Sequence, residues 1–325
     1  ISNRAERNAF YHMNEVRRVV KGWLPSLAWL DTTVTVNVNI ASTCNAGWGG
    51  NSASFFASGG GCNNTGEISD VMHHEWGHGL DINTNIGDGA TGEATGDITG
   101  IQLSHSPLIG PYFYTSGGPV RNVDQFTSGR GLLTTSNINT KCPGGGGPLG
   151  YSVHCEGEIL GQSHWDLSQA LVAKHGHHTG WRTLDRLYFT SLPDADTYLP
   201  PGPELVYDAY INADDDDGNL ANGTPNGDEI FQAFDLHGIA GTQHASSAGC
   251  LRPDQPAVVA TTDCESVDLS WGAVVGIDHY EVLRAELRQD TAYEPVATVA
   301  STATGYEDSE VAPGVDYYYV VMAVD

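Results

Sequence analysis

The residues most able to do chemistry in this chain of 325 residues are His74-Glu75-Trp76-Gly77-His78, an HExxH motif. Residues four apart lie on one face of an α-helix, one turn from each other, so the two imidazoles can hold one Zn²⁺. Glu75 then lies beside the metal, where it can reach a zinc-bound water without being a ligand. The alternative is a helix whose two histidines merely lie at a surface.

Two acidic residues downstream could complete a metal site. Glu93 follows the motif at a short distance, and Asp97 lies one helical turn beyond Glu93, on the same face. A catalytic zinc needs a third protein ligand, which Glu93 offers, and leaves its fourth position to water. Asp97 can accept a hydrogen bond from the distal nitrogen of a zinc histidine and fix its tautomer. The alternative places both acids on the solvated face of a very acidic protein.

Hydrophobic patterning predicts the elements that must position these residues. Alternating valines predict a strand over Thr33–Ile40, and a glycine-rich, hairpin-like stretch runs from Cys44 to Cys62. Ser69 is a candidate N-cap for the helix that carries the motif. The region 105–150 is rich in loop-forming residues. Helices are expected at 3–24, 69–80, 90–104 and 158–174.

These blocks together resemble the thermolysin and fungalysin group of zinc metallopeptidases. The resemblance covers roughly residues 8–240 and is strongest around 45–97. It implies an α+β, thermolysin-like fold of two lobes, with a small mixed sheet and the active-site helix followed by a mainly helical lobe. The segments that carry it are Asn8-Ala9-Phe10-Tyr11, Asn45-Ala46-Gly47-Trp48, Asp70-Val71-Met72-His73 before the motif, Val120-Arg121-Asn122-Val123, Val153-His154 and Gly157-Glu158-Ile159-Leu160.

The resemblance implies a role for five further residues. Asn45 and Ala46 would belong to an edge strand that holds the substrate backbone, and Val71 would line the S1′ pocket. Arg121 would contact a substrate carbonyl on the primed side, and His154 would stabilise the oxyanion.

Two positions depart from the family pattern. No tyrosine lies between the second histidine of the motif and Glu93. Leu149 stands where the family has the aspartate that orients the oxyanion histidine, so His154 is oriented differently or is helped by Tyr151. The short core also implies that peripheral helices and calcium sites of the family are lost.

The composition changes near residue 250, which predicts a second domain. From Pro253 onward, β-branched and aromatic residues alternate in short runs separated by turn residues, a pattern typical of a small all-β sandwich. These runs resemble a fibronectin type III module. We therefore expect a peptidase domain over 1–248 and a fibronectin type III-like module over 251–325, trimmed before its last strand.

Charge and cysteine content restrict the partners and the compartment. Lys and Arg number 14 against 40 Asp and Glu, so the net charge of −26 disfavours nucleic acid and anionic lipid. No apolar run is long enough to insert into a membrane. The six cysteines contain no CxxC pair, which favours disulfides, with 44–62, 142–155 and 250–264 as the expected pairs, over reduced core cysteines. We therefore predict a secreted protein.

Three other clusters contain acidic residues or histidines that could bind a metal. Asp214, Asp216 and Asp217 resemble part of a calcium loop, although Ala213 stands where an EF-hand has its first ligand, so a Ca²⁺ site and a solvated acidic loop both stay open. The histidines at 175, 177 and 178 fit a helix C-terminus better than a metal site. His164 and Asp166 fit a surface or second-layer position.

The sequence thus predicts a secreted, monomeric zinc endopeptidase that acts on proteins or peptides. Glu75 would be the general base and His154 would stabilise the oxyanion. One alternative is a non-catalytic adhesion or binding protein that uses its C-terminal β-module. Another is a zinc hydrolase of a non-peptide amide.

Overall fold

The computed structural model describes residues 2–84, 90–193, 204–246, 258–262, 266–274, 277–285, 293–312, 315 and 317–324, with backbone alone at 90, 204 and 205. The chain divides into two compact units, Ile1–Ser247 and Ala248–Asp325. The first mixes helices with a small sheet, and the regular elements in the described residues of the second are all strands.

The first unit begins with helix α1 (Arg4–Trp23), as predicted for 3–24. Its apolar stripe, which includes Ala9, Met13, Val16 and Val20, is buried. Asn3 starts the helix with a capping box, in which its side chain accepts from the backbone N–H of Glu6 and the Glu6 carboxylate accepts in return.

A three-stranded sheet follows, built from β1 (Thr35–Ile40), β2 (Ala46–Gly49) and β3 (Ser52–Phe56). The order is β1-β3-β2, with β1 parallel and β2 antiparallel to β3. A disulfide between Cys44 and Cys62 closes the base of the hairpin, which confirms the first predicted pair. Among the described strands, β2 therefore lies at an open edge of the sheet.

Two helices, α2 (Ser69–Asn83) and α3 (Ala90–Ser104), come next and pack closely on each other. The N-cap of α2 is Ile68, so the prediction of Ser69 was wrong; the Ser69 hydroxyl instead donates to Asp70 Oδ2 at 2.9 Å. The region 105–150 is mostly irregular, as predicted. Its short elements are β4 (Leu108–Ile109), β5 (Arg121–Asn122) and α4 (Ile138–Lys141).

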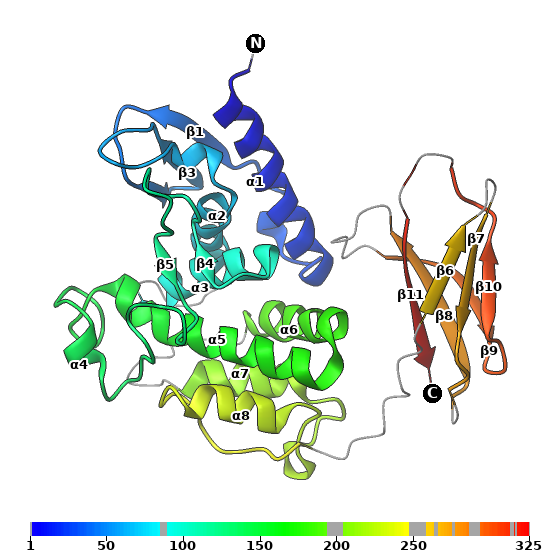
Figure 1. Ribbon diagram of the computed structural model, residues 1–325. Coiled ribbons are helices and arrows are strands. Elements are labelled where there is room, and N and C mark those ends of the chain that lie inside the picture. Colours follow the sequence, from blue (N-terminus) through cyan, green and yellow to red (C-terminus); the bar gives the residue numbers. More distant parts are fainter. Residues whose placement is uncertain are drawn as a thin grey trace. The chain divides into compact units, whose positions relative to one another are not determined.

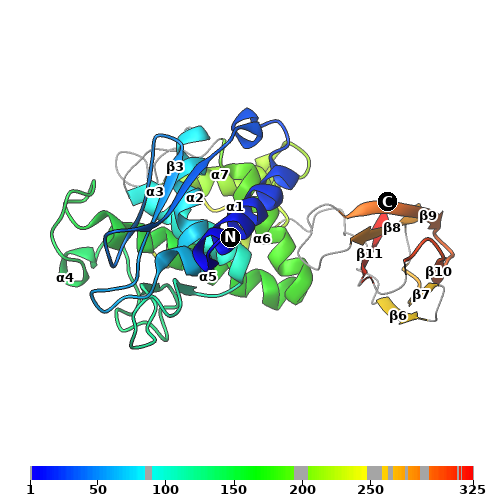
Figure 2. The ribbon, with the colours of Figure 1, turned by 90° about the horizontal axis from the view of Figure 1, so that it is seen from above.

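The rest of the first unit is helical. The described helices here are α5 (Val153–His175), α6 (His177–Ser191), α7 (Glu204–Asp214) and α8 (Gly227–Asp235). Helix α5 begins five residues before the predicted 158. Short 3-10 turns lie at Ala28–Asp31, Thr65–Glu67 and Leu220–Asn222. Figure 1 shows α2 and α3 between the layer of α1 and β1–β3 and the α5–α8 helices, and Figure 2 shows the same elements from above, with α1 in front.

The second unit consists of two three-stranded antiparallel sheets, with orders β10-β7-β6 and β11-β8-β9. Its strands are β6 (Val258–Thr262), β7 (Val267–Trp271), β8 (His279–Ala285), β9 (Glu294–Ala300), β10 (Gly305–Asp308) and β11 (Tyr318–Val324). Trp271 and Tyr280 meet edge to face in its core, which contains side chains of both sheets. The predicted all-β sandwich is confirmed. The predicted 250–264 disulfide lies outside the described residues.

The described helices include none long and apolar enough to cross a membrane.

Candidate metal centre

The three predicted ligands come together where α2 faces α3. His74 Nε2 lies 3.2 Å from His78 Nε2 and 3.5 Å from Glu93 Oε2, and His78 Nε2 lies 3.9 Å from Glu93 Oε1. Four ligands placed tetrahedrally at zinc bond lengths lie about 3.3 Å from one another. The spacing of the three donor atoms is therefore close to that of a tetrahedral site.

The chemistry of these donors fits a divalent metal ion. Two imidazole nitrogens and one carboxylate form a donor set used by catalytic zinc. Glu93 Oε2 is buried and has no hydrogen-bond partner among the described residues. Burial acts to raise the pKa of Glu93, but His74, His154 and His78 outweigh it and hold that pKa below its ordinary value. Glu93 is thus an ionised carboxylate whose Oε2 lies 3.5 Å from His74 Nε2 and 3.2 Å from His154 Nε2.

Asp97 holds His74 from the side opposite the donor atom. His74 Nδ1 and Asp97 Oδ1 lie 2.8 Å apart, so a proton on Nδ1 leaves Nε2 free as a ligand. Arg121 donates to both carboxylate oxygens of Asp97, from Nε at 2.8 Å and from Nη2 at 2.5 Å. Burial acts to raise the pKa of Asp97, but Arg121 and His74 hold it far below its ordinary range. Arg121 therefore binds Asp97, and Asp97 in turn binds the candidate ligand His74.

Two glycines let α2 and α3 approach each other. A Cβ atom on Gly96 would lie 2.6 Å from His74 Nδ1, and one on Gly77 would lie 2.7 Å from the Gly96 Cα. Both distances are too short for a real contact, so glycine is required at each position. Gly77, the fourth residue of the motif, therefore allows the helix spacing that brings Glu93 to the histidines.

Glu75 lies on the same helix, next to the candidate ligands. Its side chain is only 6% exposed. Burial raises the pKa of Glu75 to about 7, and the charge of Glu93 acts in the same direction. A carboxylate with a pKa near neutrality is suited to act as a general base and then as a general acid.

His154 lies in the first turn of α5, with Nε2 3.2 Å from Glu93 Oε2. Its side chain is 55% exposed, so it can meet a molecule that enters from solvent. Burial of the rest of the ring lowers the pKa of His154, against the opposing effect of Glu93. Among the described residues no hydrogen bond joins Tyr151 to His154, so the proposed help from Tyr151 finds no such contact.

The sequence reasoning missed Glu156, which fixes the loop before His154. Its carboxylate accepts from the backbone N–H groups of Leu149 at 3.2 Å and Tyr151 at 2.7 Å. A Cβ atom on Gly147 would lie 2.3 Å from that carboxylate. The signal available in the sequence was a run of four glycines that ends nine residues before Glu156.

The residues predicted to bind substrate lie around the same helix. Ala46 begins the edge strand β2 and pairs with Phe55 on β3. The carbonyl of Asn45, just before it, accepts from Thr65 Oγ1 at 3.1 Å. Val71 is buried in α2 beside Gly110, where a Cβ atom would lie 3.2 Å from its side chain.

The acidic run is divided by the structure. Asp214 is buried and accepts from Asn226 Nδ2 at 2.7 Å and from Arg186 Nη2 at 3.2 Å. The carboxylates that do gather are those of Asp215, Asp216 and Asp217. Asp214 therefore links α7 to the start of α8, and a calcium ligand set that includes it does not match this arrangement.

His164 is fully buried, so of its two predicted locations the surface is wrong. Its Nδ1 lies 3.0 Å from the hydroxyl of Tyr210, and its Nε2 lies 3.1 Å from Gln102 Oε1. Asp166 Oδ2 lies 3.1 Å from His237 Nε2. The contacts of His164 join α5 to α3 and α7, and that of Asp166 joins α5 to the turn after α8; all lie outside the candidate metal centre.

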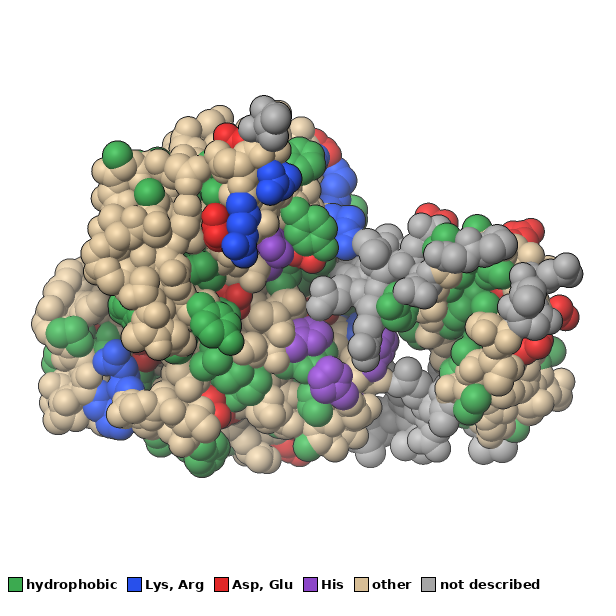
Figure 3. Space-filling view, turned by 45° about the horizontal axis from the view of Figure 1, so that its top comes forward, with side chains coloured by type: hydrophobic (Ala, Val, Ile, Leu, Met, Phe, Trp, Pro, Cys, Tyr) green, Lys and Arg blue, Asp and Glu red, His purple; other side chains and the backbone are tan. Residues whose placement is uncertain are grey.

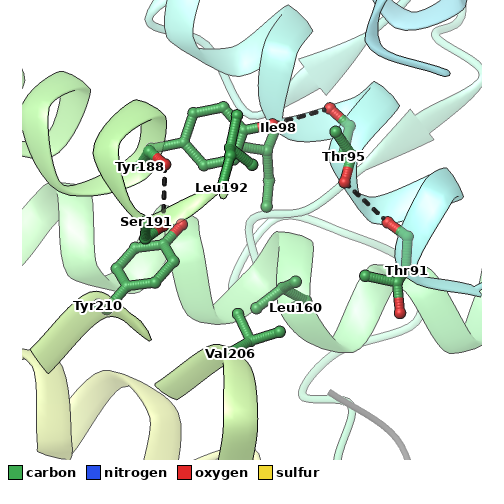
Figure 4. Close-up of a pocket in the computed structure, with 9 residues that line it drawn as sticks. All are labelled: Thr91, Thr95, Ile98, Leu160, Tyr188, Ser191, Leu192, Val206 and Tyr210. Carbon is green, nitrogen blue, oxygen red and sulfur yellow. Dashed lines mark hydrogen bonds between the residues drawn. The ribbon is translucent and has the colours of Figure 1, made fainter. Parts of the chain in front are cut away.

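A mainly apolar pocket lies between α3 and the helices α5, α6 and α7 (Figure 4). Hydrogen bonds fix its polar edge, with Thr95 Oγ1 donating to the Thr91 carbonyl at 3.0 Å and the Tyr188 hydroxyl donating to the Thr95 carbonyl at 3.2 Å. Its lining residues are Thr91, Thr95, Ile98, Leu160, Tyr188, Ser191, Leu192, Val206 and Tyr210. None of them is a candidate metal ligand or Glu75.

The exposed face in Figure 3 carries Lys and Arg side chains only in small patches. This agrees with the excess of 40 acidic over 14 basic residues. The described part of this one face shows no broad basic region.

Comparisons with known proteins identify the second unit. Residues 256–325 match the family model of the fibronectin type III domain described as the SaeA third domain. The second unit is a fibronectin type III-like module.

Individual relatives match part of the chain. An amylopullulanase of Thermoanaerobacterium saccharolyticum is 33% identical over 114 residues, which are 33% of this chain and 9% of that protein. The chain therefore spans less than a tenth of that relative. A solved Fn3-like protein from Clostridium thermocellum is 36% identical, with a TM-score of 0.21, over 23% of this chain and 78% of that one. The fn3 domain of human contactin 1 is 15% identical, with a TM-score of 0.20, over 26% and 78%.

Proposed function

We propose that this protein is a secreted zinc-dependent endopeptidase with a thermolysin-like first unit, followed in the chain by a fibronectin type III-like module. The observation that carries the proposal is the convergence of His74, His78 and Glu93 with a buried Glu75 beside them. A structural metal site needs no general base and no neighbouring exposed histidine. The HExxH resemblance and the edge strand β2 support peptides as substrates.

Each side chain has a task in the proposed reaction. His74, His78 and Glu93 would hold Zn²⁺, which when bound polarises a carbonyl and lowers the pKa of a coordinated water. Glu75 takes a proton from the attacking water and passes it to the departing amine nitrogen. His154 donates a hydrogen bond to the carbonyl oxygen as that oxygen gains negative charge.

In this proposal Arg121 acts through Asp97. Its two hydrogen bonds fix the carboxylate that in turn fixes the ring of His74. The Arg121 side chain is 11% exposed. The contact with a substrate carbonyl that the family resemblance implies would use the guanidinium N–H groups of Arg121 that do not bind Asp97.

The extracellular location is supported by the two disulfides Cys44–Cys62 and Cys142–Cys155. Such bonds persist in oxidising compartments.

The substitution Glu75→Gln tests this function. The variant should keep its zinc, because Glu75 is not a ligand, and lose nearly all cleavage of an unfolded protein, by at least 10²-fold. Zinc content and cleavage are measured on the same sample. Glu67→Gln, a surface carboxylate in a 3-10 turn beside Arg4, serves as the matched control and should cleave normally. Full activity in Glu75→Gln would remove Glu75 from the mechanism.

A second candidate function is favoured by the family match at residues 256–325. Here the module binds a surface or a polymer, and the first unit is not catalytic. Loss of surface binding on deletion of 251–325, with no peptidase activity in either form, would support that reading. A third function, hydrolysis of a non-peptide amide, is tested with a panel of substrates that includes crosslinked cell-wall peptides. Cleavage of the crosslink without cleavage of ordinary peptides would support it over the other two.

A further inference from the structure

A second group of metal-binding side chains lies away from the candidate centre, between α1 and α2. It consists of His12 and Glu15, one turn apart on α1, and His73 on α2. Glu15 Oε2 lies 2.9 Å from His12 Nδ1 and 3.6 Å from His73 Nε2, and the two imidazole rings have centroids 5.4 Å apart. One carboxylate oxygen thus lies between two imidazole nitrogens.

His73 is the residue of this group that most strongly indicates a bound ion. Its side chain is buried, at 4% exposure, and neither ring nitrogen has a hydrogen-bond partner among the described residues. Buried polar atoms in folded proteins are almost always paired with protein, water or an ion. His73 thus has a carboxylate 3.6 Å from its Nε2 and a second imidazole nearby, but neither ring nitrogen makes a hydrogen bond within the described part of the chain, and a metal ion would complete this arrangement most simply.

Asp70 is a second buried group near His73 in the sequence, although the two side chains form no hydrogen bond. It lies one turn before His73 on α2, is 3% exposed, and its Oδ1 also has no hydrogen-bond partner among the described residues. A ligating histidine usually donates its other ring N–H to a carboxylate, a backbone carbonyl or water. When a metal binds one nitrogen of His73, the other nitrogen carries a proton. Asp70, one helical turn earlier on α2, is the carboxylate that would accept it in a hydrogen bond.

We propose that His12, Glu15 and His73 form a second metal site that takes a divalent ion of the zinc type. Two imidazole nitrogens and one carboxylate oxygen suit zinc and its first-row neighbours better than Mg²⁺ or Ca²⁺, which prefer oxygen. Separations of 2.9 and 3.6 Å bracket the edge of about 3.3 Å of a tetrahedral zinc site. The His12 and Glu15 side chains are 25% and 18% exposed, which gives an ion a path from solvent.

The site would have a consequence for the candidate centre, because His73 directly precedes His74 in the chain. A metal there joins α1 to the helix that carries the HExxH motif. The inference does not rest on the proposed peptidase, since it uses three residues that the mechanism leaves out.

The test counts zinc ions on the full chain by equilibrium dialysis and metal analysis, with excess Ca²⁺ present to occupy the acidic loop. The wild type should hold two equivalents. Glu15→Gln and His12→Ala should each lose one equivalent and keep the other. His78→Ala, which removes a ligand of the first centre, should still hold one. His279→Ala is a matched change at a histidine 3.8 Å from Glu281 that has no third ligand near it in the described part of the chain, and this variant should hold two.

Other outcomes overturn the proposal. A wild type that holds one equivalent contradicts it, even if a variant fails to fold by circular dichroism. So does an unchanged count in both folded α1 variants, which would mean that any second ion is adventitious. Loss of all zinc in a folded His78→Ala would also contradict it. If the peptidase proposal alone is wrong, cleavage is absent while the second equivalent remains.

Discussion

At the scale of single residues, the candidate centre is a chain of contacts that starts at the metal donors and ends in the protein interior. His74 is held by Asp97, and Asp97 is held by Arg121 through both of its oxygens. The sequence placed Asp97 near His74 because of its helical spacing from Glu93. It could not place Arg121 there, because that contact depends on β5, a strand of two residues.

Replacement of Asp97 by Asn should weaken the metal and the fold together. His74 loses a charged partner, which should lower zinc affinity about 10- to 100-fold. Arg121 is left buried without its carboxylate, which should cost about 3 kcal/mol in the free energy of unfolding. Zinc competition with a chromophoric chelator and urea unfolding measure the two effects. Asp235→Asn, on the exposed side of α8, is the control and should change neither. Unchanged zinc affinity would show that Asp97 does not orient His74.

His164 gives the fold a defined response to acid. A neutral ring with its proton on Nε2 donates to Gln102 and accepts from Tyr210, so it is satisfied while uncharged. Burial lowers the pKa of His164 to about 3. The unfolded chain therefore binds this proton at a higher pH than the folded chain does. The stabilisation is fully present above pH 6.5 and is lost as the pH falls toward 3.

We expect His164 to account for about 2 kcal/mol of the stability lost between pH 7 and pH 4.5. In His164→Gln that share of the pH dependence should disappear. Urea unfolding at the two pH values measures it, with a chelator present so that metal release does not contribute. His279→Gln, a half-buried histidine of the second unit, should leave the dependence as it is. A steep, unchanged dependence in His164→Gln would assign the acid response to other groups.

At the scale of elements, the centre depends on how closely α2 and α3 approach. The apolar stripe of α1 and the 44–62 cysteine spacing could be recognised in the sequence because each is a local pattern. The start of α5 could not, since the Glu156 carboxylate binds the loop at Leu149 and Tyr151, a contact visible only in three dimensions. The need for glycine at 77 and 96 likewise follows from two helices that the sequence does not show meeting.

The substitution Gly96→Ala tests that closeness. Its methyl group would fall 2.6 to 3.0 Å from three atoms of the His74 ring, so the helices must separate or the ring must turn. Zinc binding should fall at least tenfold, and the melting temperature should drop. Gly100→Ala is the matched control, because on the same helix its Cβ atom meets Asp70 at an ordinary 3.6 Å. That variant should keep its zinc and be slightly more stable, as alanine favours helices. Equal zinc binding in both variants would refute the close-packing argument.

At the scale of the whole molecule, the two units are assigned on different kinds of evidence. The second unit is a fibronectin type III-like module by its family match, and its alternating runs made it predictable from sequence. The first unit is defined by its own contacts: α2 and α3 bring three ligand candidates and Glu75 together, and α5 adds His154. The proposal that it cuts peptides rests on this geometry and on the resemblance of its motifs.

The most direct test of the central claim is cleavage of an unfolded protein by the full chain before chelation, after chelation, and after zinc is restored. The account predicts cleavage that disappears with the chelator and returns with Zn²⁺. A folded protein shown to contain zinc that cleaves nothing in any of the three conditions would contradict it. Cleavage that persists in a chain shown to be free of metal would contradict it equally.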